Sequence, residues 1–223
     1  SQETENGVVT ALFSSPIPTD GLSIVGGKYV VRSRTVDGIT LSTYFFPEEA
    51  PLSDLFLEKA AEYIRTFSEL LIPYPYKKFD IVENFFTSGY GMPTYTLLGR
   101  DVVKRGHSAL RPGYLDHEIV HSWWGNYVYY EGSWGNWCEG LTTYYANYYT
   151  KERQEAEEAR LHRRGVSQKY SIRVDPKKDY PLRKFSGKEE GFEDDIGYGK
   201  ASMVFHLLRR MVGDDPFFRT MRQ

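Results

Sequence analysis

The N-terminal part of the chain alternates hydrophobic and polar residues in short runs, which is the pattern of β-strands. Residues 28–34 and 39–46 are rich in Val, Thr, Tyr and Phe, which favour an extended backbone. Between the two runs lies Asp37-Gly38, a pair that readily adopts the positive φ angles of a tight turn. The pattern predicts a β-hairpin.

Between Leu52 and Leu71 the hydrophobic residues recur at steps of three and four, which predicts a helix. Ser53 is a candidate N-cap, because its hydroxyl could accept a hydrogen bond from the first helical turn. Pro73 and Pro75 prevent the helix from continuing.

Two further strand segments are predicted after this helix. Residues 79–82 form a short run with Phe, Ile and Val, and Gly89–Leu98 reads as a glycine-rich entry into another strand. Pro93 lies inside the second segment and cannot donate a backbone hydrogen bond. The segment is therefore expected at the edge of a sheet.

The second half of the chain is predicted to be mainly helical. The expected helices are one that begins after Pro112-Gly113, one over about 137–153, a charged one over 152–164 and one over about 197–211, with a polar connection over 165–195.

Composition narrows the range of partners. The net charge is −2, so nothing indicates a nucleic-acid partner. No run of apolar residues is long enough to predict a membrane span. The single cysteine, Cys138, excludes an internal disulfide and a cysteine-rich zinc site. Compartment and oligomeric state stay open.

The motif His117-Glu118-Ile119-Val120-His121 lies in the first helix of the second half, and Glu139 follows after 17 intervening residues. Residues four apart on a helix project from nearly the same side, about 6 Å apart along the axis. Two imidazoles placed in this way can hold one metal ion, with a carboxylate as third ligand. A second Glu beside them can then move protons, as in zinc hydrolases. The sequence predicts one Zn²⁺ ion.

An alternative interpretation without a metal site is a helix that carries two His on its surface, with Glu118 as a solvated charge. The apolar residues around the motif, such as Leu115 and Trp123, favour the metal site instead. Glu131 is a rival third ligand, but it lies in a predicted turn and ranks below Glu139. Thr143 stands four residues after Glu139, where it could hydrogen-bond a ligand His or simply be an exposed Thr.

Several runs around the motif resemble the gluzincin zinc aminopeptidase family, of the aminopeptidase N and leukotriene hydrolase type. They are Trp123-Trp124-Gly125-Asn126, Glu139-Gly140 and Tyr198-Gly199-Lys200-Ala201, the last of which looks like the family's Tyr-x-Lys-Gly. The likeness covers roughly residues 28–223 in the same order.

The resemblance implies an α+β fold. Residues 51–223 would form a thermolysin-like zinc peptidase domain, a mixed sheet plus helices, and residues 1–50 the end of a preceding β-sandwich domain. Because both ends of the sequence are abrupt, the chain is expected to be a catalytic-domain fragment truncated at its C-terminus.

The resemblance also implies roles for single residues. His117, His121 and Glu139 would bind Zn²⁺, and Glu118 would act as general base toward a metal-activated water that attacks a peptide bond. Tyr198 would donate a hydrogen bond to the tetrahedral oxyanion.

Two departures from the family bear on specificity. The spacing from His121 to Glu139 is one residue shorter than usual. Where the family has Gly-x-Met-Glu-Asn, this chain has Tyr90-Gly91-Met92-Pro93-Thr94. The family's Glu binds the free α-amine of the substrate, and Pro93 carries no charge. The backbone of Gly91 and Met92 is still expected to align a peptide substrate.

Three function hypotheses follow. The first is an aminopeptidase-like zinc metallopeptidase, in which another anion, with Glu83 as a guess, receives the amine. The second is a zinc endopeptidase without recognition of the N-terminal amine. The third is a non-catalytic peptide-binding relative, against which the complete His-Glu-x-x-His motif counts, because a binding module has no need of Glu118.

Overall fold

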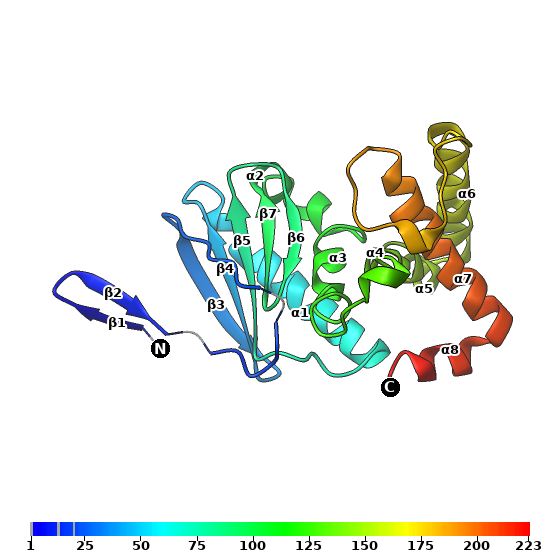
Figure 1. Cartoon of the computed structure of the whole chain (residues 1–223). Coiled ribbons are helices and arrows are strands. Elements are labelled where there is room, and N and C mark those ends of the chain that lie inside the picture. Colours follow the sequence, from blue (N-terminus) through cyan, green and yellow to red (C-terminus); the bar gives the residue numbers. More distant parts are fainter. Residues whose placement is uncertain (1, 13, 20) are drawn as a thin grey trace.

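A computed structural model describes residues 2–12, 14–19 and 21–223, with a sheet on one side and a group of helices on the other (Figure 1). The strands are β1 (Gln2–Glu5), β2 (Val8–Ala11), β3 (Val30–Val36), β4 (Ile39–Phe45), β5 (Lys78–Asn84), β6 (Gly89–Met92) and β7 (Tyr95–Gly99). The α-helices are α1 (Ser53–Leu70), α2 (Arg100–Val103), α3 (Leu115–Val120), α4 (Cys138–Thr143), α5 (Thr150–Gln154), α6 (Ala156–Arg173), α7 (Ala201–Val212) and α8 (Asp214–Thr220). Two π-helices, Tyr144–Tyr149 and Asp195–Lys200, and short 3-10 turns complete the described elements.

The main sheet has five strands in the order β3-β4-β5-β7-β6. Strand β5 is parallel to both of its neighbours, whereas β3 and β6 pair antiparallel at the two edges. A mixed sheet accompanied by helices confirms the predicted α+β class. The predicted hairpin is confirmed as β3-β4, with φ of +53° at Asp37 and +77° at Gly38. Strand β6 is an edge strand, and Pro93 follows it in the turn to β7.

The expected domain boundary at residue 50 divides this sheet. Strand β4 ends at Phe45, yet it pairs in parallel with β5, which begins at Lys78. The hairpin β3-β4 thus shares its sheet with the residues that follow the boundary. Strands β1 and β2 form a separate two-stranded sheet that extends away from it (Figure 1). That the N-terminal residues complete a β-sandwich stays a prediction.

Helix α1 joins the sheet to the helical side through aromatic contacts. The ring of Phe56 packs edge-on against Phe45 of β4, with centroids 5.2 Å apart. Near the other end of α1, Phe67 lies against Trp123, with centroids 6.4 Å apart. All four side chains are buried, and full burial of one such side chain contributes roughly 1.5–3 kcal/mol.

The helix predicted from Leu52 to Leu71 is confirmed as α1, but Ser53 is not its N-cap. A 3-10 turn, Ala50–Leu52, runs directly into α1, and the N–H of Ser53 donates to the carbonyl of Ala50. The hydroxyl of Ser53 is buried and makes no hydrogen bond to a described residue. The preceding turn continues into the helix, so no side-chain cap forms.

The second half of the chain contains more helix than predicted. The expected helix over 137–153 runs through α4, a π-helix and α5. The prediction of a loop from residue 165 onward is wrong up to Arg173, because α6 extends that far. Its second half packs against the π-helix Asp195–Lys200, where Val166 approaches Gly199 and the Lys200 ammonium donates to the Tyr170 hydroxyl at 3.3 Å.

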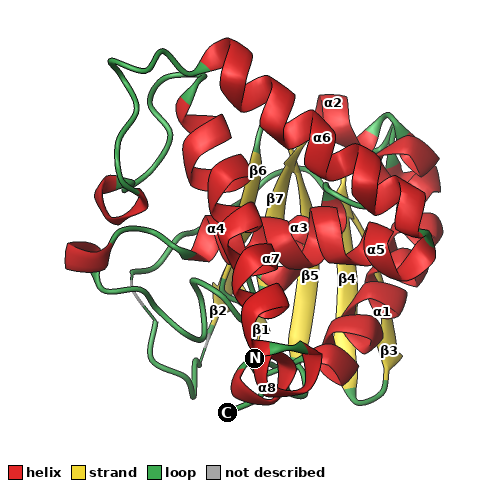
Figure 2. Cartoon of the chain, turned by 90° about the vertical axis from the view of Figure 1, so that its right-hand side faces the viewer, coloured by secondary structure: helices red, strands yellow, loops and turns green. Residues whose placement is uncertain are grey.

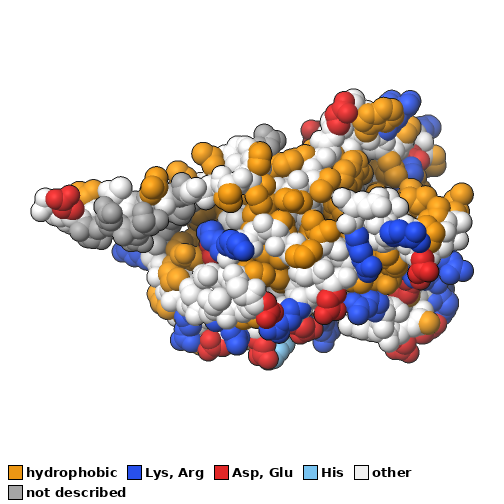
Figure 3. Space-filling view, turned by 90° about the horizontal axis from the view of Figure 1, so that it is seen from below, with side chains coloured by type: hydrophobic (Ala, Val, Ile, Leu, Met, Phe, Trp, Pro, Cys, Tyr) orange, Lys and Arg blue, Asp and Glu red, His pale blue; other side chains and the backbone are white. Residues whose placement is uncertain are grey.

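The helical group lies in front of the sheet when viewed from its own side (Figure 2). Helix α3 lies against the edge strand β6, and α4 packs against α7. On the face seen from below, Lys and Arg side chains are interspersed with Asp and Glu (Figure 3). No helix among the described residues combines the length and the apolar character needed to cross a bilayer.

Candidate metal centre

Helix α3 turns the predicted metal ligands away from the core. Leu115 and Ile119 are fully buried on its other side. The turn before the helix is held by Asp116, whose Oδ1 accepts hydrogen bonds from the backbone N–H of Gly113 at 2.7 Å and of Tyr114 at 3.1 Å. Local sequence therefore sets both where α3 begins and which of its sides is exposed to the site.

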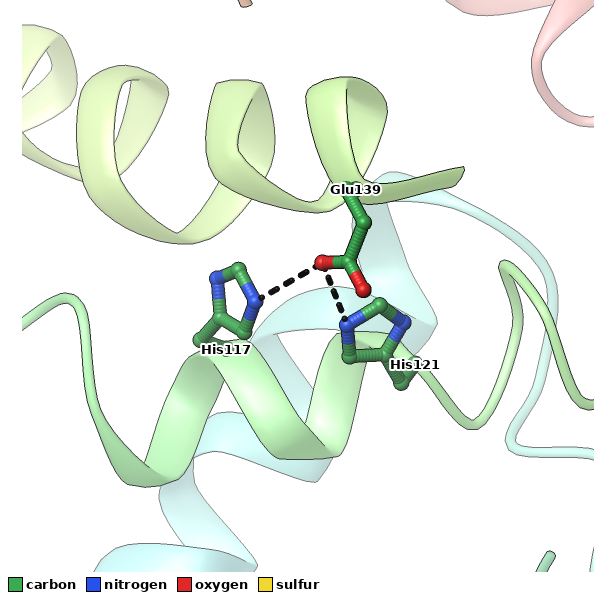
Figure 4. A group of neighbouring side chains, drawn as sticks. All are labelled: His117, His121 and Glu139. Atoms are coloured by element: carbon green, nitrogen blue, oxygen red, sulfur yellow. Dashed lines mark ion pairs between the residues drawn. The ribbon is translucent and has the colours of Figure 1, made fainter. Parts of the chain in front are cut away.

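The two imidazoles converge on Glu139 (Figure 4). His117 lies in α3, His121 follows it directly, and their ring centroids are 5.0 Å apart. Oε2 of Glu139, in the first turn of α4, lies 3.5 Å from Nε2 of His117 and 3.2 Å from Nε2 of His121. Two ligands of a tetrahedral zinc, each about 2.0–2.2 Å from the ion, are about 3.3–3.6 Å apart. The spacing of these atoms fits one such ion.

The charges of the three side chains are complementary. Burial lowers the pKa of His117, but hydrogen bonding to Glu139 and the charges of Glu118 and Glu139 outweigh it and raise that pKa to about 9. Burial raises the pKa of Glu139, but the two imidazoles have the larger, opposite effect, so the pKa of this carboxyl lies below its usual range. Oε2 of Glu139 is buried and accepts no well-aligned hydrogen bond from a described residue. A cation would satisfy this oxygen, so the donor set fits a metal ion.

Glu139 lies near Nε2 of each imidazole, and an oxygen atom of another residue lies near Nδ1 of each ring. Oδ1 of Asn147 lies 3.2 Å from Nδ1 of His117. The carbonyl oxygen of Trp124 lies 2.9 Å from Nδ1 of His121, and the Thr142 hydroxyl lies 3.4 Å from the same nitrogen. These contacts orient the rings so that both Nε2 atoms point at Glu139.

The hydrogen bond expected of Thr143 is made by its neighbour Thr142. Thr143 lines the same cleft, but its hydroxyl is buried and makes no hydrogen bond to a described residue. Asn147, which contacts His117, was missed by the sequence analysis. It comes eight residues after Glu139, off the expected helix face, and periodicity gave no signal for it.

Strand β6 borders the site, and glycine makes its close approach to α3 possible. A Cβ atom at Gly91 would lie 2.6 Å from Cβ of His121, and one at Gly89 would lie 3.0 Å from Oε1 of Glu118. Asn126 joins the two elements, because its Nδ2 donates to the carbonyls of Gly91 at 3.0 Å and His121 at 2.9 Å. The predicted substrate residues, Gly91 and Met92, thus lie beside the predicted ligands.

Tyr198 reaches the site from the π-helix Asp195–Lys200. Its ring is nearly parallel to that of His117, with centroids 6.1 Å apart, and Phe185 packs edge-on against it. Burial raises the pKa of its hydroxyl, and the adjacent Glu139 carboxylate raises it further. Tyr198 therefore keeps its proton and can donate a hydrogen bond.

These residues line one cleft with a volume of about 970 Å³, bounded by β6, α3, α4, α6 and the second π-helix. Glu118 also lines this cleft. Burial raises the pKa of its carboxyl, and this effect is larger than the lowering by the two imidazoles. Glu131 is exposed and accepts a hydrogen bond from Ser133, outside the cleft lining. Glu83 is fully buried, and its Oε2 accepts a hydrogen bond from the Phe46 N–H. Neither glutamate is among the residues of the site.

The short spacing between His121 and Glu139 is accommodated in the loop between α3 and α4. This loop contains a 3-10 turn, Gly132–Trp134, and Gly135 with φ of +79°. The N–H of Asn136 donates to the carbonyl of Phe185 at 2.6 Å, which anchors the loop directly before Glu139. A shorter loop therefore still delivers the carboxylate to the imidazoles.

Two imidazoles and a carboxylate on adjacent helices, with a free Glu beside them, define the His-Glu-x-x-His class of metallopeptidases. The model of the peptidase family M1 domain matches residues 56–223. The chain belongs to this family.

Solved structures have the same fold. The M1 zinc metallopeptidase from Deinococcus radiodurans is 20% identical, with a TM-score of 0.68, over 99% of this chain and 50% of that one. A Glu-to-Ala mutant from the same organism, bound to a Tyr-Ser-Ala substrate, gives 20% identity, a TM-score of 0.66 and the same coverage. This chain thus spans about half the length of these proteins. No curated protein sequence matches it.

Proposed function

We propose that the chain carries the active site of a zinc-dependent metallopeptidase that hydrolyses peptide bonds. The observation that carries this proposal is the convergence of His117 and His121 on one oxygen of Glu139, with Glu118 left free beside them. Membership of the M1 peptidase family supports it. His117, His121 and Glu139 would hold the Zn²⁺ ion, which when bound would acidify water and polarise the substrate carbonyl.

Glu118 is proposed as the general base. Its carboxylate lines the cleft beside the ligand side chains, next to Gly89 of the edge strand. From there it would take a proton from the attacking water and deliver it to the leaving amine. Tyr198, which keeps its proton, would donate a hydrogen bond to the oxygen that becomes negative in the transition state.

The peptide substrate is proposed to lie along β6. One edge of this strand pairs with β7, and Gly89, Gly91 and Met92 line the cleft. An extended peptide can add to such an edge by backbone hydrogen bonds. Gly91 and Met92 would then bind the substrate backbone, although the carbonyl of Gly91 already accepts a hydrogen bond from Asn126.

The charge of the cleft bears on whether cleavage begins at the N-terminus. Pro93 carries no charge, and Glu83 is buried away from the cleft. The acidic residues that line the cleft, besides Glu118 and Glu139, are Asp194 and Asp195, which pair with Lys188 and Arg173. The family resemblance favours an aminopeptidase. A zinc endopeptidase is favoured because, among the described residues that line the cleft, each carboxylate other than Glu118 and Glu139 is paired with a cation.

The test compares the chain with its Glu118→Gln variant. We expect the variant to retain zinc, measured by metal analysis, and to lose peptidase activity by about 10²–10⁴-fold, the typical contribution of general acid–base catalysis. Glu131→Gln is the matched control, because Glu131 lies outside the cleft, and it should leave both zinc and activity unchanged. Undiminished turnover in Glu118→Gln would contradict the assignment of Glu118.

The substrates distinguish the alternatives. Cleavage of amino-acid anilides alone indicates an aminopeptidase, and cleavage of internally quenched peptides with blocked N-termini indicates an endopeptidase. Zinc binding without turnover of either substrate indicates a non-catalytic peptide-binding relative.

A further inference from the structure

The groups that contact Nδ1 of the two imidazoles in the metal centre are uncharged. The atoms at Nδ1 are the amide oxygen of Asn147 for His117, and the Trp124 carbonyl and Thr142 hydroxyl for His121. No carboxylate among the described residues hydrogen-bonds to either Nδ1. The support of His121 comes partly from the backbone, whereas that of His117 depends on one side chain.

We propose that Asn147 is the positioning residue that fixes the tautomer and orientation of His117, and that the π-helix Tyr144–Tyr149 brings it there. This inference rests on the proposed metal site. A His that binds a metal through Nε2 must carry its proton on Nδ1, and that proton needs an acceptor. Oδ1 of Asn147, 3.2 Å away, is that acceptor.

The π-helix explains how Asn147 reaches this position. On a regular α-helix each residue turns by about 100°, so a residue eight positions after Glu139 lies about 80° away from it around the axis. A π-turn holds one residue more than an α-turn, which turns the following residues back by about one position. Asn147 then lies within about 20° of Glu139, on the side that faces His117.

The amide nitrogen of Asn147 lies close to the turn that starts α3. A Cβ atom at Gly113 would lie 2.8 Å from Nδ2 of Asn147. Gly113 has φ of +111°, a conformation that favours glycine, and its N–H donates to Asp116. The turn that starts α3 thus leaves space for the amide while the amide oxygen faces His117.

The test is the zinc affinity of the full chain, measured by competition with a chelator at equilibrium. Replacement of a residue that supports a ligand typically weakens metal binding by about 10–100-fold. Asn147→Leu, which has similar size and no acceptor, should show such a loss. Asn147→Asp keeps an acceptor and adds charge, so it should bind zinc at least as tightly as the unaltered chain.

Thr143→Val is the matched control, because the Thr143 hydroxyl lies in the same cleft and has no hydrogen-bond partner among the described residues. It should change zinc affinity by less than about twofold. The melting temperature of each metal-free variant separates a loss of fold from a loss of affinity.

Two results would overturn the role of Asn147: an Asn147→Leu variant that binds zinc normally, or equal losses in Asn147→Leu and Asn147→Asp. In both cases the proposed zinc site would stand, because the unaltered chain still binds zinc, and the proposed catalysis would be tested separately by Glu118→Gln. An unaltered chain that binds no zinc would instead reject the proposed function, and this inference with it.

Discussion

The two walls of the cleft are built in different ways. The strand wall, β6 with α3, depends on a close backbone approach, in which Gly91 lies against His121. The helical wall consists of α4, α6 and the two π-helices, and it supplies Glu139, Asn147 and Tyr198. The site therefore requires groups from both walls, and its geometry depends on how each wall is held.

The helical wall is supported by α7, which packs against α4 and both π-helices and carries a buried cation. Arg209 of α7 is 8% exposed and forms paired hydrogen bonds with Asp214, both at 2.9 Å. The same guanidinium forms a close ion pair with Glu152 and donates to the Tyr144 hydroxyl at 3.2 Å. It thereby connects α7 and α8 to the first π-helix and α5. Helices with irregular turns are held together here by directional polar contacts.

The largest effect is expected from Arg209→Met, which removes the centre of this network. The Glu152 side chain is 24% exposed, and it would lose its cationic partner while staying largely buried. Loss of one partner of a buried ion pair typically destabilises a protein by about 3–5 kcal/mol. The measurement is the free energy of unfolding in urea. Arg210→Met is the control, because Arg210 is exposed, and it should differ from the unaltered chain by less than about 0.5 kcal/mol. Equal stability of the two variants would refute the role given to the network.

A smaller effect is expected from adding one methyl group to each wall. In Gly91→Ala, the new Cβ would lie 2.6 Å from Cβ of His121, and in Gly140→Ala it would overlap Cβ of Ala201, between α4 and α7. Overpacking of this kind typically costs about 1–3 kcal/mol. Both variants should lower the melting temperature and weaken zinc binding, because each moves one ligand-bearing element.

Gly26→Ala is the control for this pair, because no atom lies within 4 Å of a Cβ at that position. It should leave zinc affinity unchanged. If only one of the two wall variants weakened zinc binding, the other wall would have accommodated its methyl group without moving its ligand. The pair thus shows which wall has to keep its backbone position for the metal to bind.

The sheet and the strand wall at its edge were easier to predict from the sequence than the helical wall. The hairpin at Asp37-Gly38, the edge position of the segment with Pro93, and the spacing of the His-Glu-x-x-His motif are all local signals. The π-helices have no such signal, because an extra residue in a turn is stabilised by packing with other elements. The position of Asn147 depends on that extra residue. The hydrogen bond of Thr142, which precedes the π-helix, depends instead on how α4 packs against α3, whereas helical periodicity from Glu139 favoured Thr143.

The end of α6 was mispredicted for a related reason, and it leads to the smallest expected effect. Gly165, at which the predicted loop begins, lies in the middle of α6, where glycine lowers helix propensity. No atom lies within 4 Å of a Cβ at this position, so Gly165→Ala creates no overlap. Because alanine loses less backbone entropy than glycine on folding, the variant should be more stable by about 0.5–1 kcal/mol. Urea unfolding measures this gain, and zinc affinity should stay constant because Gly165 does not line the cleft. A loss of stability in Gly165→Ala would mean that the helical wall needs flexibility at this point, in contrast to the strand wall, where Gly91 is needed for space.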